Sequence, residues 1–143
     1  MQLNLIPAMD ISSSALDVER ERMKVTANNI ANIHSTKDAD GGVYKRRELV
    51  FSAVFKDSLN SENPTADLNG VKIEDMVSDS APPMRIYAPY HPDADQTGMV
   101  NMPNIQPIKE MVDMITTTRA YEANLAVMKQ SRDMADNTLR LGK

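Results

Sequence analysis

Cysteine is absent from this chain of 143 residues, so disulfide bonds and thiolate chemistry are excluded. Tryptophan is also absent, phenylalanine occurs only twice, and aromatic residues make up 4% of the chain. The large side chains that usually anchor a core are therefore scarce. Eleven methionines take part of that role, because methionine fills irregular gaps and suits helix surfaces that must adapt to their neighbours.

Charge and hydropathy disfavour nucleic acid and membrane partners. The formal net charge is −4, and the chain has no basic stripe for nucleic acid or anionic lipid. No apolar run approaches the roughly 20 residues of a membrane span. Asp10 stands where a signal peptide would have its apolar core, and the first basic residue is Arg20. We therefore expect no cleavable secretory signal, so export would need another route.

Glycine and proline are missing from two long stretches, 8–40 and 108–141. Because these residues break helices most strongly, the pattern predicts a mainly α fold with a small β insertion. We expect an N-terminal helix within 1–34, a strand-and-turn segment over 35–104 and a C-terminal helix within 105–143. The two helices are expected to pair as an antiparallel coiled coil and to form one helical core domain.

Apolar side chains recur every seven residues in both helical segments, which is the spacing of a coiled-coil seam. In the first segment two such rows are offset by two residues, or about 200° around the helix. A second stripe on a helix requires a second neighbour. The predicted assembly residues of the first segment are Met9, Leu16, Met23 and Ile30 in one row and Ile11, Val18 and Val25 in the other. Those of the last segment are Met111, Met114, Tyr121, Leu125, Met128 and Leu139 in a main row and Met134 and Leu141 in a second.

These rows favour an assembling protein. A rod of two helices leaves much of its apolar surface exposed, and such surfaces on a protein in water mark interaction sites. The alternative is a bundle of three or four helices that covers its own stripes. Since the central segment supplies no third long helix, we expect neighbouring copies to cover them.

The central segment has strand and turn signals. Val43–Phe55 is rich in β-branched and aromatic residues, which predicts a strand. Asn69-Gly70 predicts a tight turn before the alternating stretch Val71–Glu74. Pro82-Pro83 ends that stretch, and Met84–Tyr87 is a candidate for one more short strand.

One cluster could carry chemistry. His91, Asp93 and Asp95 alternate along the chain, so that in an extended segment they would share a face and could bind a divalent metal. The other interpretation, which we favour, is a solvated acidic loop closed by Pro92 and Gly98. With two histidines, no cysteine and no phosphate-binding loop, the chain has little material for a catalytic site. We expect no enzyme activity and no cofactor.

Several local strings resemble the flagellar rod and hook protein family. The strings run from Arg22 to Asn32, from Gly42 to Arg46, from Tyr87 to Asp95, from Gly98 to Asn104, from Glu110 to Met114, from Arg119 to Asn124 and from Leu139 to Gly142. The first is shared by rod and hook relatives. The proline-rich stretch leading into Met102-Pro103-Asn104, together with the short chain, is similar to the proximal-rod members.

The resemblance implies a structural subunit of the bacterial flagellar basal-body rod, the axle that transmits torque and surrounds the export channel. It also implies export by the flagellar type III apparatus and a place in the rod as it crosses the periplasm. The implied partners are copies of the same chain, proximal and distal rod subunits, MS-ring proteins, export-gate proteins and the export apparatus. Another axial protein of the family, or a structural component of a related type III secretion system, is the alternative.

Overall fold

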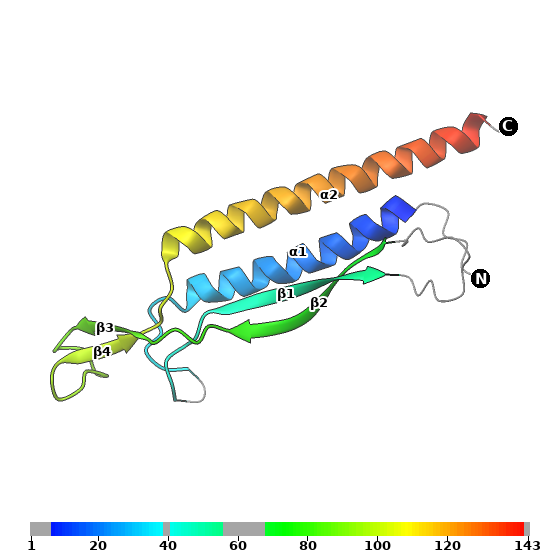
Figure 1. Cartoon of the computed structure of the whole chain (residues 1–143). Coiled ribbons are helices and arrows are strands. Elements are labelled where there is room, and N and C mark those ends of the chain that lie inside the picture. Colours follow the sequence, from blue (N-terminus) through cyan, green and yellow to red (C-terminus); the bar gives the residue numbers. More distant parts are fainter. Residues whose placement is uncertain (1–6, 39–40, 56–67, 142–143) are drawn as a thin grey trace.

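The computed structural model describes residues 7–38, 41–55 and 68–141 and has a long helix at each end with antiparallel strands between them (Figure 1). This confirms the predicted helix–strands–helix layout. The elements are, in chain order, α1 (Pro7–Ala31), β1 (Arg47–Phe55), β2 (Leu68–Ser78), β3 (Met84–Tyr87), β4 (Met99–Met102) and α2 (Pro107–Leu141). Both helices begin at a proline, which is tolerated because first-turn amides have no helical acceptor. No helix in the described ranges combines the length and apolarity needed to cross a membrane.

Helix α1 lies between two neighbours. On one side α2 runs antiparallel to it, and on the other lies the hairpin of β1 and β2 (Figure 1). Thr118 Oγ1 of α2 lies 3.9 Å from Met23 Sδ of α1. On the hairpin side, Ser14 Oγ accepts a hydrogen bond of 3.2 Å from the backbone N–H of Val71. α1 is thus the middle layer of a helix–helix–hairpin stack.

The second apolar row of α1 is covered within the chain. Val18 and Val25 are only 7% and 8% exposed, whereas Ile11 at the start of the row is exposed. Ser14, on the same face, binds the hairpin. The second neighbour that this row requires is therefore supplied, at Val18 and Val25, by the hairpin of the same molecule.

The buried apolar side chains are few and are spread over α1, β1 and the segment that leads from β4 into α2. Val100 in β4 and Ile105 just before α2 are the most deeply buried apolar side chains among the described residues. Tyr44 and Leu49, before and within β1, are also buried. β3 and β4 pair antiparallel, from Met84 opposite Met102 to Tyr87 opposite Met99. Among the described elements, β3 and β4 form a sheet of their own, and this sheet packs against neither helix.

The predicted turn at Asn69-Gly70 is wrong, because both residues lie within β2. The pairing of β1 with β2 shifts register between Val54 and Phe55, opposite this dipeptide. Gly70 has φ +125°, a conformation that side chains rarely adopt. A Cβ at Gly70 would clash with Ser14 Oγ and lie 3.0 Å from Ser14 Cβ. Gly70 thus allows β2 to approach α1 closely, and it does not form a hairpin turn.

We predict that Gly70→Ala lowers the free energy of unfolding by about 1–3 kcal/mol, because the alanine is strained in φ and collides with α1. Gly42→Ala is the matched control, since its Cβ would meet no atom within 4 Å. Its effect should stay within about 0.5 kcal/mol. Urea unfolding followed by circular dichroism measures both, and equal stability of the two variants would contradict the close approach.

Candidate assembly surface

The face of α2 that packs on α1 carries small or polar residues at every seventh position. Glu110, Thr117 and Ser131 are buried and Asn124 is half-buried. Of the helices and strands that the structure describes, only α1 packs against α2. Half-buried large side chains alternate with this polar row. They are Met114, Tyr121 and Met128. The inner face of α2 therefore follows alternating steps of three and four residues, with polar residues at four of these seven positions.

Helix α1 presents a matching face to α2. Ser12 and Thr26 are buried, and Leu16, Met23 and Ile30 are half-buried at the intervening positions. The row that sequence analysis identified by hydrophobicity is thus completed by polar residues that hydrophobicity alone does not find. A buried hydroxyl is tolerated here where it has a partner, as Thr117 Oγ1 donates 2.8 Å to the carbonyl of Asp113.

Several predicted interface residues of α2 point away from α1, because polar residues occupy the inner positions of the helix. Met111 and Leu125 each follow one of them in sequence, and one residue is a rotation of about 100° on a helix. Both side chains are therefore exposed. Exposed apolar side chains on one chain are what contact with another molecule would cover.

Fourteen of the fifteen predicted interface residues fall into three groups by their burial. Met9, Leu16, Met23, Ile30, Met114, Tyr121 and Met128 are half-buried, Val18 and Val25 are buried, and Ile11, Met111, Leu125, Met134 and Leu139 are exposed. The side chain of Leu141 lies outside the part of the chain that the structure describes. The exposed group lies mostly on α2, which has 35 residues against 25 in α1 and continues past the start of α1 (Figure 1).

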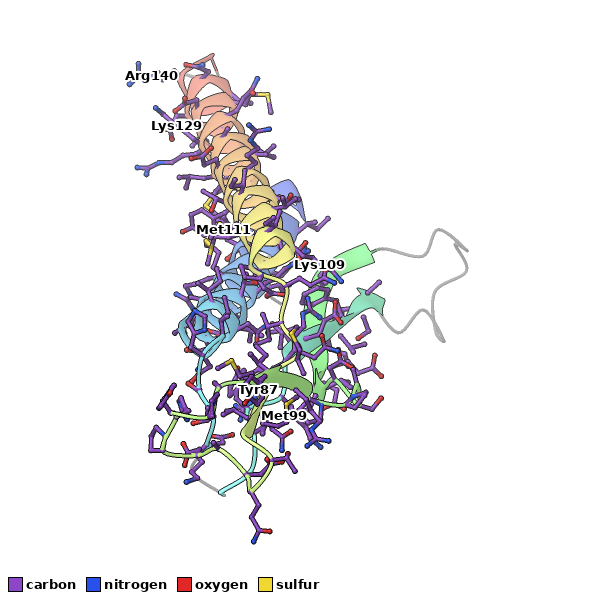
Figure 2. All side chains as sticks on the ribbon, turned by 90° about the vertical axis from the view of Figure 1, so that its left-hand side faces the viewer. Tyr87, Met99, Lys109, Met111, Lys129 and Arg140 are labelled. Carbon is purple, nitrogen blue, oxygen red and sulfur yellow. The ribbon has the colours of Figure 1, made fainter. Side chains whose placement is uncertain are left out.

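Sequence analysis missed a compact apolar patch at the start of α2. It consists of Ile108, Met111, Val112 and Ile115, which are between 53% and 79% exposed. We call these four residues the outer patch. Their spacing of i, i+3, i+4 and i+7 places them on one stripe of the helix. That spacing is visible in the sequence, but a search for seven-residue rows selected only Met111. Figure 2 shows Met111 and Lys109 on opposite sides of α2, viewed from its N-terminal end.

A buried polar cluster, made of Asn29, Tyr44, Arg46 and Glu110, fixes the start of α2 against α1. Asn29 Nδ2 donates to the carbonyl of Arg47 at 2.9 Å and to Glu110 Oε2 at 3.1 Å. Asn29 Oδ1 accepts from the Tyr44 hydroxyl at 3.1 Å and from the N–H of Arg47 at 3.0 Å. The amide thus uses its full capacity of two donors and two acceptor positions.

Arg46 neutralises the buried carboxylate of this cluster. Glu110 is 1% exposed, and Arg46 Nε lies 2.6 Å from its Oε1. Arg46 also lies 3.1 Å from Glu48 and 3.6 Å from Asp113. Burial lowers the pKa of Arg46, but the hydrogen bond and charge of Glu110 outweigh it, so the pKa lies above its ordinary value. Burial also disfavours the ionised form of Tyr44, and it therefore raises the pKa of the Tyr44 hydroxyl. A buried carboxylate left without Arg46 would be strongly destabilising.

The loop between β3 and β4 uses its two aspartates as structural acceptors. Asp93 accepts 2.8 Å from Thr36 Oγ1 and pairs with Lys37, which ties the loop to the segment after α1. Asp95 Oδ1 accepts from the Thr97 N–H and hydroxyl at 2.8 and 2.5 Å and from the Met99 N–H at 2.9 Å. Among residues 7–38, 41–55 and 68–141, no three His, Asp or Glu side chains are grouped so that they could hold a metal ion. These contacts favour the structural interpretation of the loop over the metal site.

We predict that Asn29→Ala lowers the free energy of unfolding by about 2–4 kcal/mol, because it removes the hydrogen bonds that the Tyr44 hydroxyl, the backbone of Arg47 and Glu110 Oε2 make with this amide. Asn28→Ala, at the exposed neighbouring position, should change it by less than about 0.5 kcal/mol. Chemical denaturation of both variants checks this. Similar stabilities would show that the cluster does not hold the two helices.

We predict that Asp95 titrates with a pKa of about 2, lowered chiefly by the hydrogen bond from the Thr97 side chain. Because the folded pKa lies below the unfolded value of about 3.9, the carboxylate stabilises the loop above pH 4 and this contribution is lost as the pH falls toward 2. Thr97→Ala should raise the pKa of Asp95, whereas Gln96→Ala should leave it unchanged. A carboxyl NMR titration measures it, and a pKa of about 3.9 in the parent chain would refute the assignment.

Comparison with known proteins identifies relatives over nearly the whole chain. The sequence model described as "Flagella basal body rod protein" matches residues 9–37, and that described as "Flagellar basal body rod FlgEFG protein C-terminal" matches residues 96–141. These two ranges cover most of α1 and all of β4 and α2.

Three full-length relatives carry the same description, "Flagellar basal-body rod protein FlgC". The protein from Aquifex aeolicus is 38% identical over 142 residues, covering 99% of both chains. The one from Escherichia coli is 35% identical over 139 residues, covering 97% of this chain and 98% of the relative. The one from Bacillus subtilis is 35% identical over 147 residues, covering 95% and 97%.

Proposed function

This chain belongs to the FlgC family of flagellar basal-body rod proteins, and from that membership we propose how it builds the rod. It is a structural subunit of the basal-body rod. We infer that it belongs to the proximal rod and assembles through its two terminal helices. In this proposal the assembled helices form the axle that transmits torque and surrounds the export channel.

The exposed apolar side chains of α2 are the observation that carries this proposal. Met111, Leu125, Met134 and Leu139 are all exposed in the single chain. Their burial against neighbours would contribute about 25 cal/mol per Å² of apolar surface removed from water. Methionine at such positions lets one helix adapt to slightly different neighbours along a helical stack.

We further propose that α1 and α2 pair as an antiparallel coiled coil that forms one helical core domain from residues 1–34 and 105–143, with 35–104 as its insertion. The alternating three- and four-residue steps on both inner faces support this pairing. The two contacts Met23–Thr118 and Asn29–Glu110 both join late positions of α1 to early positions of α2, as antiparallel pairing requires.

The proposed partners follow from the family. They are copies of this chain, proximal and distal rod subunits, MS-ring and export-gate proteins and the flagellar type III export apparatus. The proposed location is the rod where it crosses the periplasm, reached without a cleavable signal peptide. The proposal includes no catalysis and no cofactor, and it is supported by the use of Asp93 and Asp95 as structural acceptors in their loop.

We predict that Leu125→Asp leaves the chain folded but blocks its incorporation into rods. Leu125 is exposed, so the single chain tolerates the carboxylate, whereas an apolar interface would have to desolvate it. Assembled basal bodies should fall at least about tenfold, which corresponds to roughly 1.4 kcal/mol of interface free energy. Counting basal bodies and measuring swimming in a strain that carries only this variant tests the prediction.

Gln130→Glu is the control, because it adds the same charge at an exposed position of α2 without removing an apolar side chain. It should swim normally. Normal rods with Leu125→Asp would refute the role proposed for this surface of α2.

A further inference from the structure

The inner faces of α1 and α2 repeat the same order of large and polar residues. In each helix a large apolar side chain alternates with a polar one, and the pattern returns every seven residues. On α1 the large residues are Met9, Leu16, Met23 and Ile30, and the polar ones are Ser12, Glu19 and Thr26. On α2 the large residues are Met114, Tyr121 and Met128, and the polar ones are Glu110, Thr117, Asn124 and Ser131. All of these residues are buried or half-buried.

In the antiparallel pairing proposed above, each level of the helix pair places a large side chain opposite a polar one. The contacts Met23–Thr118 and Asn29–Glu110 fix the register of the two helices. Large beside small fills the space between two helices without overpacking it. The levels that follow from this register are Thr26 with Met114, Met23 with Thr117, Glu19 with Tyr121, Leu16 with Asn124, Ser12 with Met128 and Met9 with Ser131.

This alternation excludes small shifts of α2 along α1 but permits one larger shift. A shift of three or four residues would place large side chains opposite large ones, such as Met23 opposite Tyr121, and would leave gaps between the polar ones. A shift of seven residues, about 10.5 Å along the axis, places large opposite polar again, as in Met23 with Asn124. The inner faces alone therefore determine the register only to a multiple of seven residues.

Helix α2 is long enough for such a shift, in the direction that moves its start past the end of α1. It has 35 residues against 25 in α1, and its C-terminal end continues past the start of α1 (Figure 1). After the shift Met9 would lie opposite Thr138, which is still within α2. Seven residues turn a helix by only about 20°, so the outer patch would still be directed away from α1.

The polar cluster of Asn29, Tyr44, Arg46 and Glu110 has no such repeat. Asn29 binds the other parts of the cluster through its side-chain amide, and Glu110 pairs with Arg46 at 2.6 Å. After a shift of seven residues Glu110 would have moved by about 10.5 Å, and Thr117, which carries no carboxylate, would take its place. Because Tyr44 and Arg46 lie outside the helices, only the observed register satisfies the cluster.

We propose that this cluster is a register lock. It selects one of two positions of α2 along α1 that differ by seven residues, and breaking it populates the second position. The proposal goes beyond the proposed function, and it rests on the coiled-coil pairing but not on the rod assignment. A helix with two discrete positions would present the same apolar stripe to neighbouring subunits at two places about 10.5 Å apart along its axis.

Pairs of introduced cysteines report the register directly, because the chain has no cysteine of its own. Met23→Cys with Thr118→Cys reports the observed register, and Met23→Cys with Leu125→Cys reports the shifted one. Met23→Cys with Tyr121→Cys is the matched control, since position 121 is on the inner face between the other two. A disulfide requires Cα atoms within about 7 Å, so each pair closes only near its own register.

With the cluster intact, only the pair at positions 23 and 118 should close. In the Asn29→Ala background the product at 23 and 125 should rise at least about tenfold relative to the product at 23 and 118, because the observed register no longer has the bonds of Asn29. Glu110→Gln, which keeps the size of the side chain and removes its charge, should act in the same direction. Mass spectrometry of the dilute full-length chain, oxidised as a monomer, measures the products.

Thr138→Phe gives a second test, because it affects only the shifted register. Thr138 is exposed and lies beyond the start of α1 in the observed register. After the shift it would face Met9, and a phenylalanine would overpack that level. Added to Asn29→Ala, it should reduce the product at 23 and 125 at least about fivefold and leave the product at 23 and 118 unchanged. Asn137→Phe, at an exposed position that would not face α1, is the control and should reduce neither.

The outcomes separate the register lock from the pairing on which it rests. If both cluster variants close only the pair at 23 and 118, the helices keep their register without the cluster and the lock is refuted. If the pair at 23 and 121 closes as readily as that at 23 and 125, no discrete second register exists, and the lock is also refuted. Loss of helical circular dichroism in both cluster variants would refute it too, because the second register would then not be stable. If the pair at 23 and 118 does not close even with the cluster intact, the coiled-coil pairing itself fails.

Discussion

The side-chain amide of Asn29 is the constraint on which the rest of the structure depends. Its four hydrogen bonds join α1 to Tyr44, to the backbone of Arg47 and to Glu110 at the start of α2. Glu110 is buried as a carboxylate, so it requires both this amide and the guanidinium of Arg46. Because these groups come from three separate parts of the chain, their bonds form only when α2 begins beside the end of α1. The cluster thus sets where the two helices meet and the direction in which α2 leaves.

From that starting point the inner faces of the helices determine what is left for other molecules. Polar residues such as Glu110 and Asn124 occupy inner positions of α2, and the apolar side chains that follow them, Met111 and Leu125, are exposed. The helix pair therefore buries less apolar surface within the chain than its composition would allow. This arrangement suits a rod subunit, since apolar surface that is not buried between α1 and α2 remains available for contact with neighbouring subunits.

The hairpin of β1 and β2 covers most of the second apolar row of α1. Sequence analysis inferred that Val18 and Val25 need a second neighbour, and the neighbour is β1 and β2 of the same chain. Periodicity shows that a face is apolar, but it does not identify the molecule that covers it. The strand assignment of Asn69 and Gly70 has a similar cause. The dipeptide favours a turn locally, whereas the close approach of β2 to Ser14 uses the missing side chain of Gly70 within a strand.

The order of helix, strands and helix was determined by the sequence itself, because the absence of glycine and proline over long stretches and the seven-residue rows act locally, within a few turns of helix. The strings that resembled the rod family were equally readable, and three of them contain the members of the polar cluster, Asn29, Tyr44, Arg46 and Glu110. Only the tertiary structure decided which faces are covered and which remain open. Burial depends on residues far apart in the chain, as between Asn29 and Glu110. A step of one residue on α2, a rotation of about 100°, separates the buried Glu110 from the exposed Met111.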